Sequence, residues 1–158
     1  LGTELGDVVM SLGTSGTVFA VTSKPAHDGS GAVAGFADAT GEYLPLVATL
    51  NAARPIDAVR QLFGFSWDEL ADAVTRSDPG SSGLTVLPFF DGERTPNLPD
   101  ANGSLHGMTR GSLTPENVTR AVVEGVIANL ARGADAIAQH TQPPSRLILI
   151  GGAAQNPG

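Results

Sequence analysis

The sequence contains no cysteine, which excludes a disulfide framework and a thiolate metal site. It is also poor in basic residues: 9 Lys and Arg against 16 Asp and Glu give a formal net charge of -7. A nucleic-acid surface needs clustered Lys and Arg, so this class of function is disfavoured. No apolar run is long enough to span a bilayer, and nothing resembles a signal peptide. These absences predict a cytoplasmic protein with neither a nucleic-acid nor a membrane partner.

Aromatic residues are scarce too, with a single Trp and a single Tyr. The core therefore has to be assembled from small, closely packed aliphatic side chains, which favours α/β layers. A length of 158 residues with 41% hydrophobic content suffices for one domain with a core, and it is short for two. Because the chain opens on Leu1 without an initiator Met and stops at Gly158 within a Gly-rich motif, we expect 1–158 to be a single, incomplete domain of a longer protein.

The first third of the chain predicts two β-hairpins. Apolar, β-branched runs at 7–10 and 17–22 flank a Gly/Ser/Thr turn at 11–16. The runs 32–36 and 43–49 flank a second group of turn-forming residues in the same way. We therefore expect two pairs of strands before the first helix.

Two helices are expected next. Apolar positions recur at three- and four-residue spacing over 52–63, and Gly64 supplies a C-terminal stop. Ser66 and Glu69 have the spacing of a capping box, in which each side chain satisfies a backbone amide of the first turn. This box predicts a short helix that ends at about Thr75.

The second half predicts a strand, a long loop, a helix and a final strand. Residues 84–90 have strand character, whereas 91–112 hold Gly, Pro, Asn and Asp at a density that excludes both helix and strand. A Thr-Pro pair begins a helix over 114–140. The apolar run 147–150 is expected to be a strand buried on both faces. The predicted inner face of the long helix is Val118, Ala121, Val122, Val126, Leu130, Ala134 and Ile137.

The turn in the first hairpin is a candidate phosphate cradle. Its glycines, Gly13 and Gly16, let the backbone come close to an anion, and the hydroxyls of Thr14, Ser15 and Thr17 add donors. The alternative interpretation is an ordinary hairpin turn that is rich in turn-forming residues.

A second glycine turn follows the last strand. Gly151-Gly152 leaves a surface without side chains on which an adenine or ribose can lie, and Asn156 follows closely enough to bond to an edge of the ligand. The alternative is a strand-to-helix connection in which glycine allows close packing.

Four motifs together resemble the C-terminal domain of the FGGY carbohydrate kinases, most closely the xylulokinases among them. The resemblance covers essentially the whole chain, and the Gly-Glu-Arg-Thr-Pro run favours xylulokinases over glycerol or gluconate kinases. The four motifs are Ser11 to Gly16, Leu87 to Pro96, Gly107 to Thr109, and Leu149 to Ala153.

The resemblance implies an actin-like ATPase (ribonuclease H-like) fold with a mixed sheet and flanking helices. It implies ATP and Mg²⁺ as cofactors and transfer of a phosphoryl group to D-xylulose, a ketopentose. In the family, the phosphate turn matches Gly13 and Thr14, the adenosine motif matches the second glycine turn, and the start of a helix borders the nucleotide. The expected nucleotide-binding set is Gly13, Thr14, Ser15, Ala53, Asp57, Gly151, Gly152 and Asn156.

By the same resemblance, the general-base Asp lies upstream of Leu1, and a missing N-terminal domain holds the Mg²⁺ and the sugar. We therefore expect no catalytic residue and no metal ligand within this chain, which alone would bind nucleotide without transferring phosphate. Two alternatives stay open: a kinase for ribulose, glycerol or gluconate, and a non-catalytic nucleotide-binding module. The loop 91–112 is a possible dimer interface.

Several conspicuous residues are interpreted as structural. Asp91 and Glu93 are neighbours in one loop, which does not suit a glycosidase pair. We expect Arg94 to hold the loop together through one of these carboxylates; the alternatives are a contact with phosphate or with an interface. Trp67 is interpreted as a packing residue. The three histidines lack partners at metal-ligand spacing; they are His27, His106 and His140.

Overall fold

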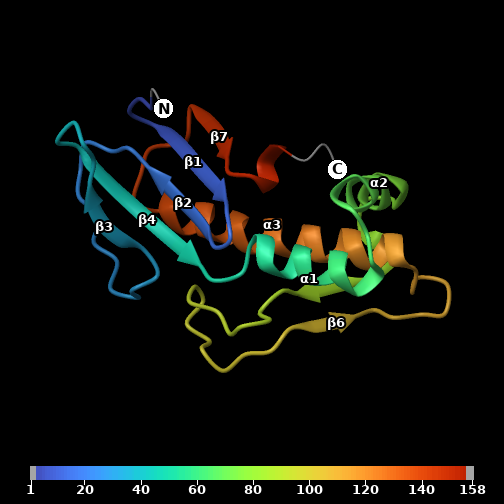
Figure 1. The fold of residues 1–158 in the computed structure, drawn as a ribbon. Helices are drawn as coiled ribbons and strands as arrows, with labels where there is room; N and C mark the ends of the chain where they lie inside the picture. Colours follow the sequence, from blue (N-terminus) through green and yellow to red (C-terminus); the bar gives the residue numbers. More distant parts are fainter. Residues whose placement is uncertain (1–2, 156–158) are drawn as a thin grey trace.

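The computed structural model describes residues 3–155, and its main feature is a five-stranded mixed sheet (Figure 1). The strand order is β3-β4-β2-β1-β7. Neighbouring strands pair antiparallel except β7, which runs parallel to β1. Both predicted hairpins are confirmed. The strands of this sheet are β1 (Asp7–Leu12), β2 (Gly16–Ala20), β3 (Ala34–Ala37), β4 (Tyr43–Thr49) and β7 (Arg146–Ile150).

Three helices flank the sheet and confirm the predicted α/β architecture: α1 (Ala53–Phe63), α2 (Trp67–Arg76) and α3 (Pro115–Ala138). The helix α3 passes along the sheet, while α1 and α2 lie together beyond the carboxyl end of β1 (Figure 1). Gly64 ends α1 with a φ of 69°. The capping box of α2 is formed, because the Ser66 hydroxyl accepts from the Glu69 amide at 3.2 Å and the Glu69 carboxylate accepts from the Ser66 amide at 2.7 Å. The described residues also include two short 3-10 turns, η1 (Ser81–Gly83) and η2 (Ala153–Gln155).

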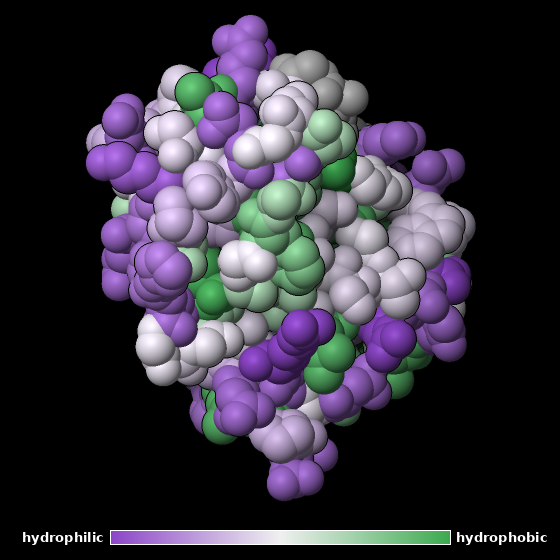
Figure 2. Space-filling model, turned by 90° about the vertical axis from the view of Figure 1, so that its left-hand side faces the viewer, coloured by the Kyte–Doolittle hydropathy of each residue, from purple (hydrophilic) through white to green (hydrophobic). Residues whose placement is uncertain are grey.

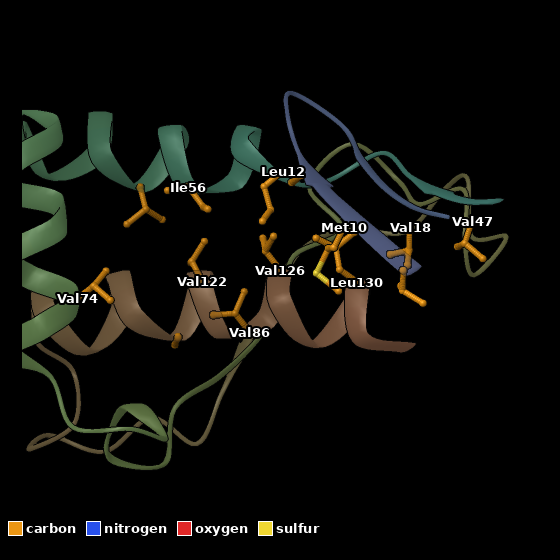
Figure 3. Close-up of a cluster of buried hydrophobic side chains, with 14 of the residues drawn as sticks. Met10, Leu12, Val18, Val47, Ile56, Val74, Val86, Val122, Val126 and Leu130 are labelled. Atoms are coloured by element: carbon orange, nitrogen blue, oxygen red, sulfur yellow. The ribbon is translucent and has the colours of Figure 1, made fainter. Parts of the chain in front are cut away.

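The core lies between α3 on one side and α1 and the sheet on the other (Figure 3). It is built from small aliphatic side chains, as the scarcity of aromatics predicted. The long helix contributes most of its predicted inner face: Val118 and Ala134 are partly buried at its margin, and five positions are fully buried. Those five are Ala121, Val122, Val126, Leu130 and Ile137.

The side of the molecule formed by β3 and β4 is largely hydrophilic. Figure 2 shows hydrophilic residues around a smaller group of apolar residues in the middle of this face. The large apolar side chains exposed on these two strands are Phe36 and Tyr43. Exposed apolar residues in such small numbers are normal on a folded protein.

Two predictions about the second half are wrong in part. The strand expected at 84–90 is only β5 (Thr85–Leu87), because the following proline cannot donate to a ladder. The segment expected to be free of strands contains β6 (Ser104–His106), which pairs antiparallel with β5 in a separate two-stranded sheet. A strand of three residues is too short for its alternation to be seen among glycines and prolines. Its pairing depends on close backbone contact, since a Cβ on Gly107 would lie 2.1 Å from the carbonyl oxygen of Gly83.

The prediction that the last strand is buried on both faces is also wrong for the described residues. Leu147 and Leu149 of β7 are 57% and 54% exposed. They pair with Val8 and Met10, so they lie on the same face of the sheet as the core. The helix α3 covers this face by packing against β2 and β4, and it does not extend over β7.

The parallel strands β1 and β7 are tied at their first residues by an ion pair. Arg146 donates to both carboxylate oxygens of Asp7, with its Nε at 2.9 Å from Oδ1. Asp7 is 1% exposed and also accepts from the Glu4 amide at 2.8 Å. The hydrogen bonds from Arg146 and then from Glu4 lower the pKa of Asp7 to about 2. The ion pair therefore favours the folded state whenever this carboxylate is ionised.

The Asp7→Asn variant is expected to melt at a lower temperature than the unchanged protein at pH 7. Since the pKa of Asp7 is lower in the folded state, its ionised form stabilises the fold above the ordinary pKa of about 4, and this contribution disappears as the pH falls towards 2. The difference in melting temperature should therefore shrink between about pH 4 and pH 2. Thermal unfolding followed by circular dichroism across this range measures it. A difference that stays constant with pH would contradict the assignment, and the exposed Asp72→Asn on α2 is the control.

Candidate functional site

A cavity of about 700 Å³ opens where the turn between β1 and β2 meets α1, α2 and η2. It joins parts of the chain that are far apart in sequence. Four of the residues predicted to bind nucleotide line it: Gly13 and Thr14 of the first glycine turn, Ala53 at the start of α1, and Gly152 of the second turn. Its other lining residues are Leu12, Ile56, Trp67, Asp68, Leu70, Val74, Val123, Ala153 and Gln155.

The two glycine turns lie side by side because their strands are parallel neighbours. Ser11 of β1 is paired with Ile150 of β7, so both strands end at the same edge of the sheet. Gly151 then packs directly on the backbone of Leu12: its φ is 102°, and a Cβ there would lie 2.4 Å from the Leu12 carbonyl oxygen. Only glycine fits this approach. The alternative interpretation of the second turn therefore holds in part, since Gly151 does serve close packing.

The start of α1 is fixed to the first glycine turn by a backbone hydrogen bond. The Ala53 amide donates to the Gly13 carbonyl at 3.0 Å. Ala52 provides no side-chain cap, and the first turn of α1 contains no acidic residue, so no carboxylate of that turn opposes an anion there. Pro55 has no amide to offer. The exposed turn residues Thr14 and Ser15 are consequently better placed than the helix to supply donors to a phosphate.

The remaining predicted residues lie near the cavity or outside the described residues. Ser15 and Gly151 belong to the two turns but are not among the lining residues. Asp57 of α1 is held on its own helix, since its carboxylate accepts from Arg60 Nε at 2.8 Å and from Gln61 Nε2 at 2.7 Å. The Arg60 hydrogen bond is the main reason why the pKa of Asp57 is lowered. Asn156 lies outside residues 3–155.

Sequence reasoning missed the wall that α2 contributes. Trp67 and Asp68 from its first turn line the cavity, and Trp67 is 50% exposed. The Arg60 guanidinium carbon lies 4.9 Å from the centre of the Trp67 ring, on the α1 side. The capping box located the start of this helix, but no sequence signal indicates that the helix turns towards the β1–β2 turn. The interpretation of Trp67 as a packing residue therefore leaves out its exposed ring in the cavity.

The loop after β5 differs from its predicted organisation. Asp91 pairs with Arg54 at 3.5 Å, and the hydrogen bond from Arg94 to Glu93 comes from the backbone amide at 2.7 Å. The expectation that the Arg94 side chain holds the loop is thus not met within the described residues. Glu93 is fully buried and Asp91 is exposed, so the two carboxylates do not flank a common cavity.

The described residues contain neither a cluster of metal-ligating side chains nor a helix that could span a membrane. Within 3–155, no three or more His, Cys, Asp and Glu side chains gather in a way that could hold a metal ion. In the same range, no helix has the length and apolar character needed to cross a membrane.

Comparison with known proteins identifies the family. Residues 8–158 match the model of the FGGY family of carbohydrate kinases, C-terminal domain. The xylulose kinase of Streptomyces rubiginosus is 46% identical over 98% of this chain, which spans 31% of that relative, and the gluconokinase of Bacillus subtilis is 30% identical over 96% of the chain. The crystal structure of xylulose kinase from Bifidobacterium adolescentis superposes with a TM-score of 0.88 at 46% identity, covering 99% of this chain and 31% of that one. The chain, with its actin-like ATPase fold, therefore belongs to the FGGY family of carbohydrate kinases.

Proposed function

We propose that the protein containing this chain is an ATP-dependent xylulokinase and that the chain supplies its nucleotide-binding part. The observation that carries this proposal is the cavity in which Gly13, Thr14, Ala53 and Gly152 meet. Its volume of about 700 Å³ lies in the range typical of small-ligand sites. The similarity to xylulose kinases favours D-xylulose as the acceptor.

The shape of the cavity suggests how ATP lies in it. The backbone and hydroxyls of the Gly13 to Ser15 turn face the phosphates, because they are the polar, exposed groups at the edge of the sheet. The adenosine lies between the second glycine turn and α2, where Leu70 and Val74 provide an apolar wall and the Trp67 ring is available for stacking. In this arrangement the γ-phosphate points away from α2, towards the tip of the β1–β2 turn.

The chain provides orientation for the reaction, and other groups are needed for the chemistry. We propose that a general-base Asp upstream of Leu1 takes the proton from the terminal sugar hydroxyl. An N-terminal domain would hold the sugar and Mg²⁺, and the share of 31% that this chain spans of the Streptomyces rubiginosus xylulose kinase is compatible with such a domain. The residues of this chain would hold the nucleotide in line with the acceptor, which is the principal requirement of phosphoryl transfer.

The direct test compares the intact protein with residues 1–158 in a coupled assay of ADP formation. The intact protein should turn over with ATP and D-xylulose, and the isolated chain should not. Ribulose, glycerol and gluconate are assayed in parallel, because the 30% identity to a gluconokinase makes another acceptor the main competing function. Preference for one of these would reject D-xylulose and retain the kinase. An absence of turnover with every acceptor, together with binding of ADP, would favour the non-catalytic module.

The Trp67→Ala variant is expected to weaken nucleotide binding in the intact protein. Loss of base stacking on an aromatic ring costs about 1–3 kcal/mol, so the KM for ATP should rise by about fivefold or more while the KM for the sugar stays unchanged. Steady-state kinetics with each substrate varied in turn measures this. Phe36→Ala removes an aromatic ring of similar exposure on β3 and is the control. An unchanged KM for ATP in Trp67→Ala would contradict the proposed position of the base.

A further inference from the structure

Glu93 is a fully buried carboxylate surrounded by four hydrogen-bond donors. Oε1 accepts from the Leu50 amide at 2.6 Å and the Arg94 amide at 2.7 Å. Oε2 accepts from Asn51 Nδ2 at 3.1 Å and Asn129 Nδ2 at 3.0 Å. Its relative exposure is 0%. A buried carboxylate is costly unless hydrogen bonds satisfy it, and these four donors compensate for its burial.

The donors come from three separate parts of the fold. Leu50 and Asn51 form the connection between β4 and α1, Asn129 belongs to α3, and Arg94 belongs to the same loop as the carboxylate. Asn51 strengthens the link, because its Nδ2 also donates to the Gly92 carbonyl at 2.6 Å. The loop is therefore fastened to the residues that immediately precede α1.

The loop end of this link is closed by backbone hydrogen bonds of its own. Glu93 and Leu98 exchange two backbone hydrogen bonds, at 2.8 and 2.9 Å. Gly92 has a φ of 72°, and a Cβ on it would lie 2.1 Å from the Pro99 carbonyl oxygen, so the loop folds back closely on itself. A compact loop can act as a fixed support for the β4–α1 connection.

The connection leads directly to the nucleotide cavity. Ala53 follows Asn51 by two residues, lines the cavity and donates its amide to Gly13. Ala52 makes no side-chain cap bond, so on the backbone the start of α1 is held by the hydrogen bond from Ala53 to Gly13. The buried side-chain contacts that hold this start in the described structure are those of Glu93 and Asn51, and the exposed ion pair of Arg54 with Asp91 lies beside them.

We propose that Glu93 is a positioning residue for the nucleotide: it sets the start of α1 against the Gly13 turn and so determines affinity for ATP. This inference rests on the proposed function. Glu93 does not line the cavity and acts through the backbone of residues 50–53.

Three variants of the intact protein test the inference. Glu93→Ala removes all four bonds, and the KM for ATP should rise by about tenfold while the KM for the sugar changes by less than about twofold. Glu93→Gln should restore the KM for ATP to within about threefold. Its oxygen still accepts from Leu50 and Arg94. Its amide can donate to the side-chain oxygen of Asn129 once the Asn129 amide group turns over, because that oxygen is buried and has no hydrogen-bond partner in the described structure.

Asn129→Ala is the matched control for stability. It removes one donor from α3 but leaves the bonds to Leu50 and Asn51, so the melting temperature should fall while the KM for ATP stays near that of the unchanged protein. If Asn129→Ala raised the KM for ATP as much as Glu93→Ala does, the loss of any one hydrogen bond to Glu93 would be enough to weaken ATP binding. That result would overturn the inference. Equal KM values for ATP in Glu93→Ala and the unchanged protein would overturn it as well.

Two further measurements cover the cases in which Glu93→Ala does not fold or the unchanged protein phosphorylates no sugar. If Glu93→Ala does not fold, Asn51→Ala takes its place, since it removes the side-chain half of the link and should raise the KM for ATP. If the unchanged protein phosphorylates no sugar, the proposed function fails, and calorimetric titration with ADP then tests Glu93 alone. In that case, equal ADP affinities of the unchanged protein and the variant would reject the positioning role.

Discussion

Replacing Gly151 with alanine should both destabilise the protein and reduce its kinase activity. A residue with a side chain is strained at a φ of 102°, and its Cβ would meet three backbone atoms of Leu12, the closest at 2.4 Å. Backbone strain of this kind costs about 1–3 kcal/mol before the contact is relieved. The contact between the added Cβ and Leu12 can be relieved only if β7 and β1 move apart at the edge of the sheet where the two glycine turns meet. Because displacements of about 1 Å can cost 100-fold in rate, we expect kcat/KM for ATP to fall by about that factor.

The neighbouring Gly152→Ala is the matched control for this prediction. A Cβ on Gly152 would have no atom within 4 Å, so the melting temperature should not change. Gly152 nevertheless lines the cavity, and an added methyl group would occupy part of the space proposed for adenosine. The two variants therefore separate loss of stability, which is expected only for Gly151→Ala, from obstruction of the proposed adenosine site, which is expected for Gly152→Ala. Equal melting temperatures for both variants would contradict the packing role of Gly151.

Replacing Leu130 with alanine should be the most destabilising change in the core. Leu130 is fully buried on α3 and packs under the first residue of β2 (Figure 3). Truncation of buried leucines costs about 2–5 kcal/mol, depending on how far the cavity collapses. For a chain of this size, the melting temperature should fall by about 10 °C. Ile127→Ala on the same helix, where the side chain is 41% exposed, should cost much less.

A double variant of Gly16 and Leu130 tests the packing of these two residues against each other directly. A Cβ on Gly16 would lie 2.5 Å from Leu130 Cδ2 and 2.6 Å from Thr49 Oγ1. Gly16→Ala is therefore destabilising alone, and the space made by Leu130→Ala should relieve part of its cost. The double variant should be more stable than the sum of the single effects by about 1 kcal/mol, measured by denaturant unfolding. Strict additivity would show that Leu130 does not fill the space beside Gly16.

Local signals in the sequence predicted most of the elements correctly. The stop at Gly64, the box formed by Ser66 and Glu69, and the Thr-Pro start of α3 each depend on a few neighbouring residues, and each is present in the structure. Such signals are legible because the interactions that they describe are local. The glycine motifs also indicated the two turns, and the pairing of β1 with β7 places them together.

Features that depend on distant contacts could not be predicted from the sequence. The exposure of Leu147 follows from where α3 crosses the sheet, and the apolar run itself contains no information on that. The short β6 exists because β5 is available as a partner. The role of Trp67 in the cavity and the donors around Glu93 both depend on how loops and helices meet in three dimensions.

The pairing of β7 with β1 determines where the family can vary in length. The strand is held at its first residue by the ion pair of Arg146 with Asp7, and just beyond its last residue by the contact of Gly151 with Leu12. One inserted or deleted residue between these two anchors would turn the side chains that follow it to the opposite face of the sheet and carry Gly151 away from Leu12. The connection at 139–145 has no such double constraint. Evolutionary gaps in alignments of these kinases should accumulate in that connection and avoid the five residues of the strand.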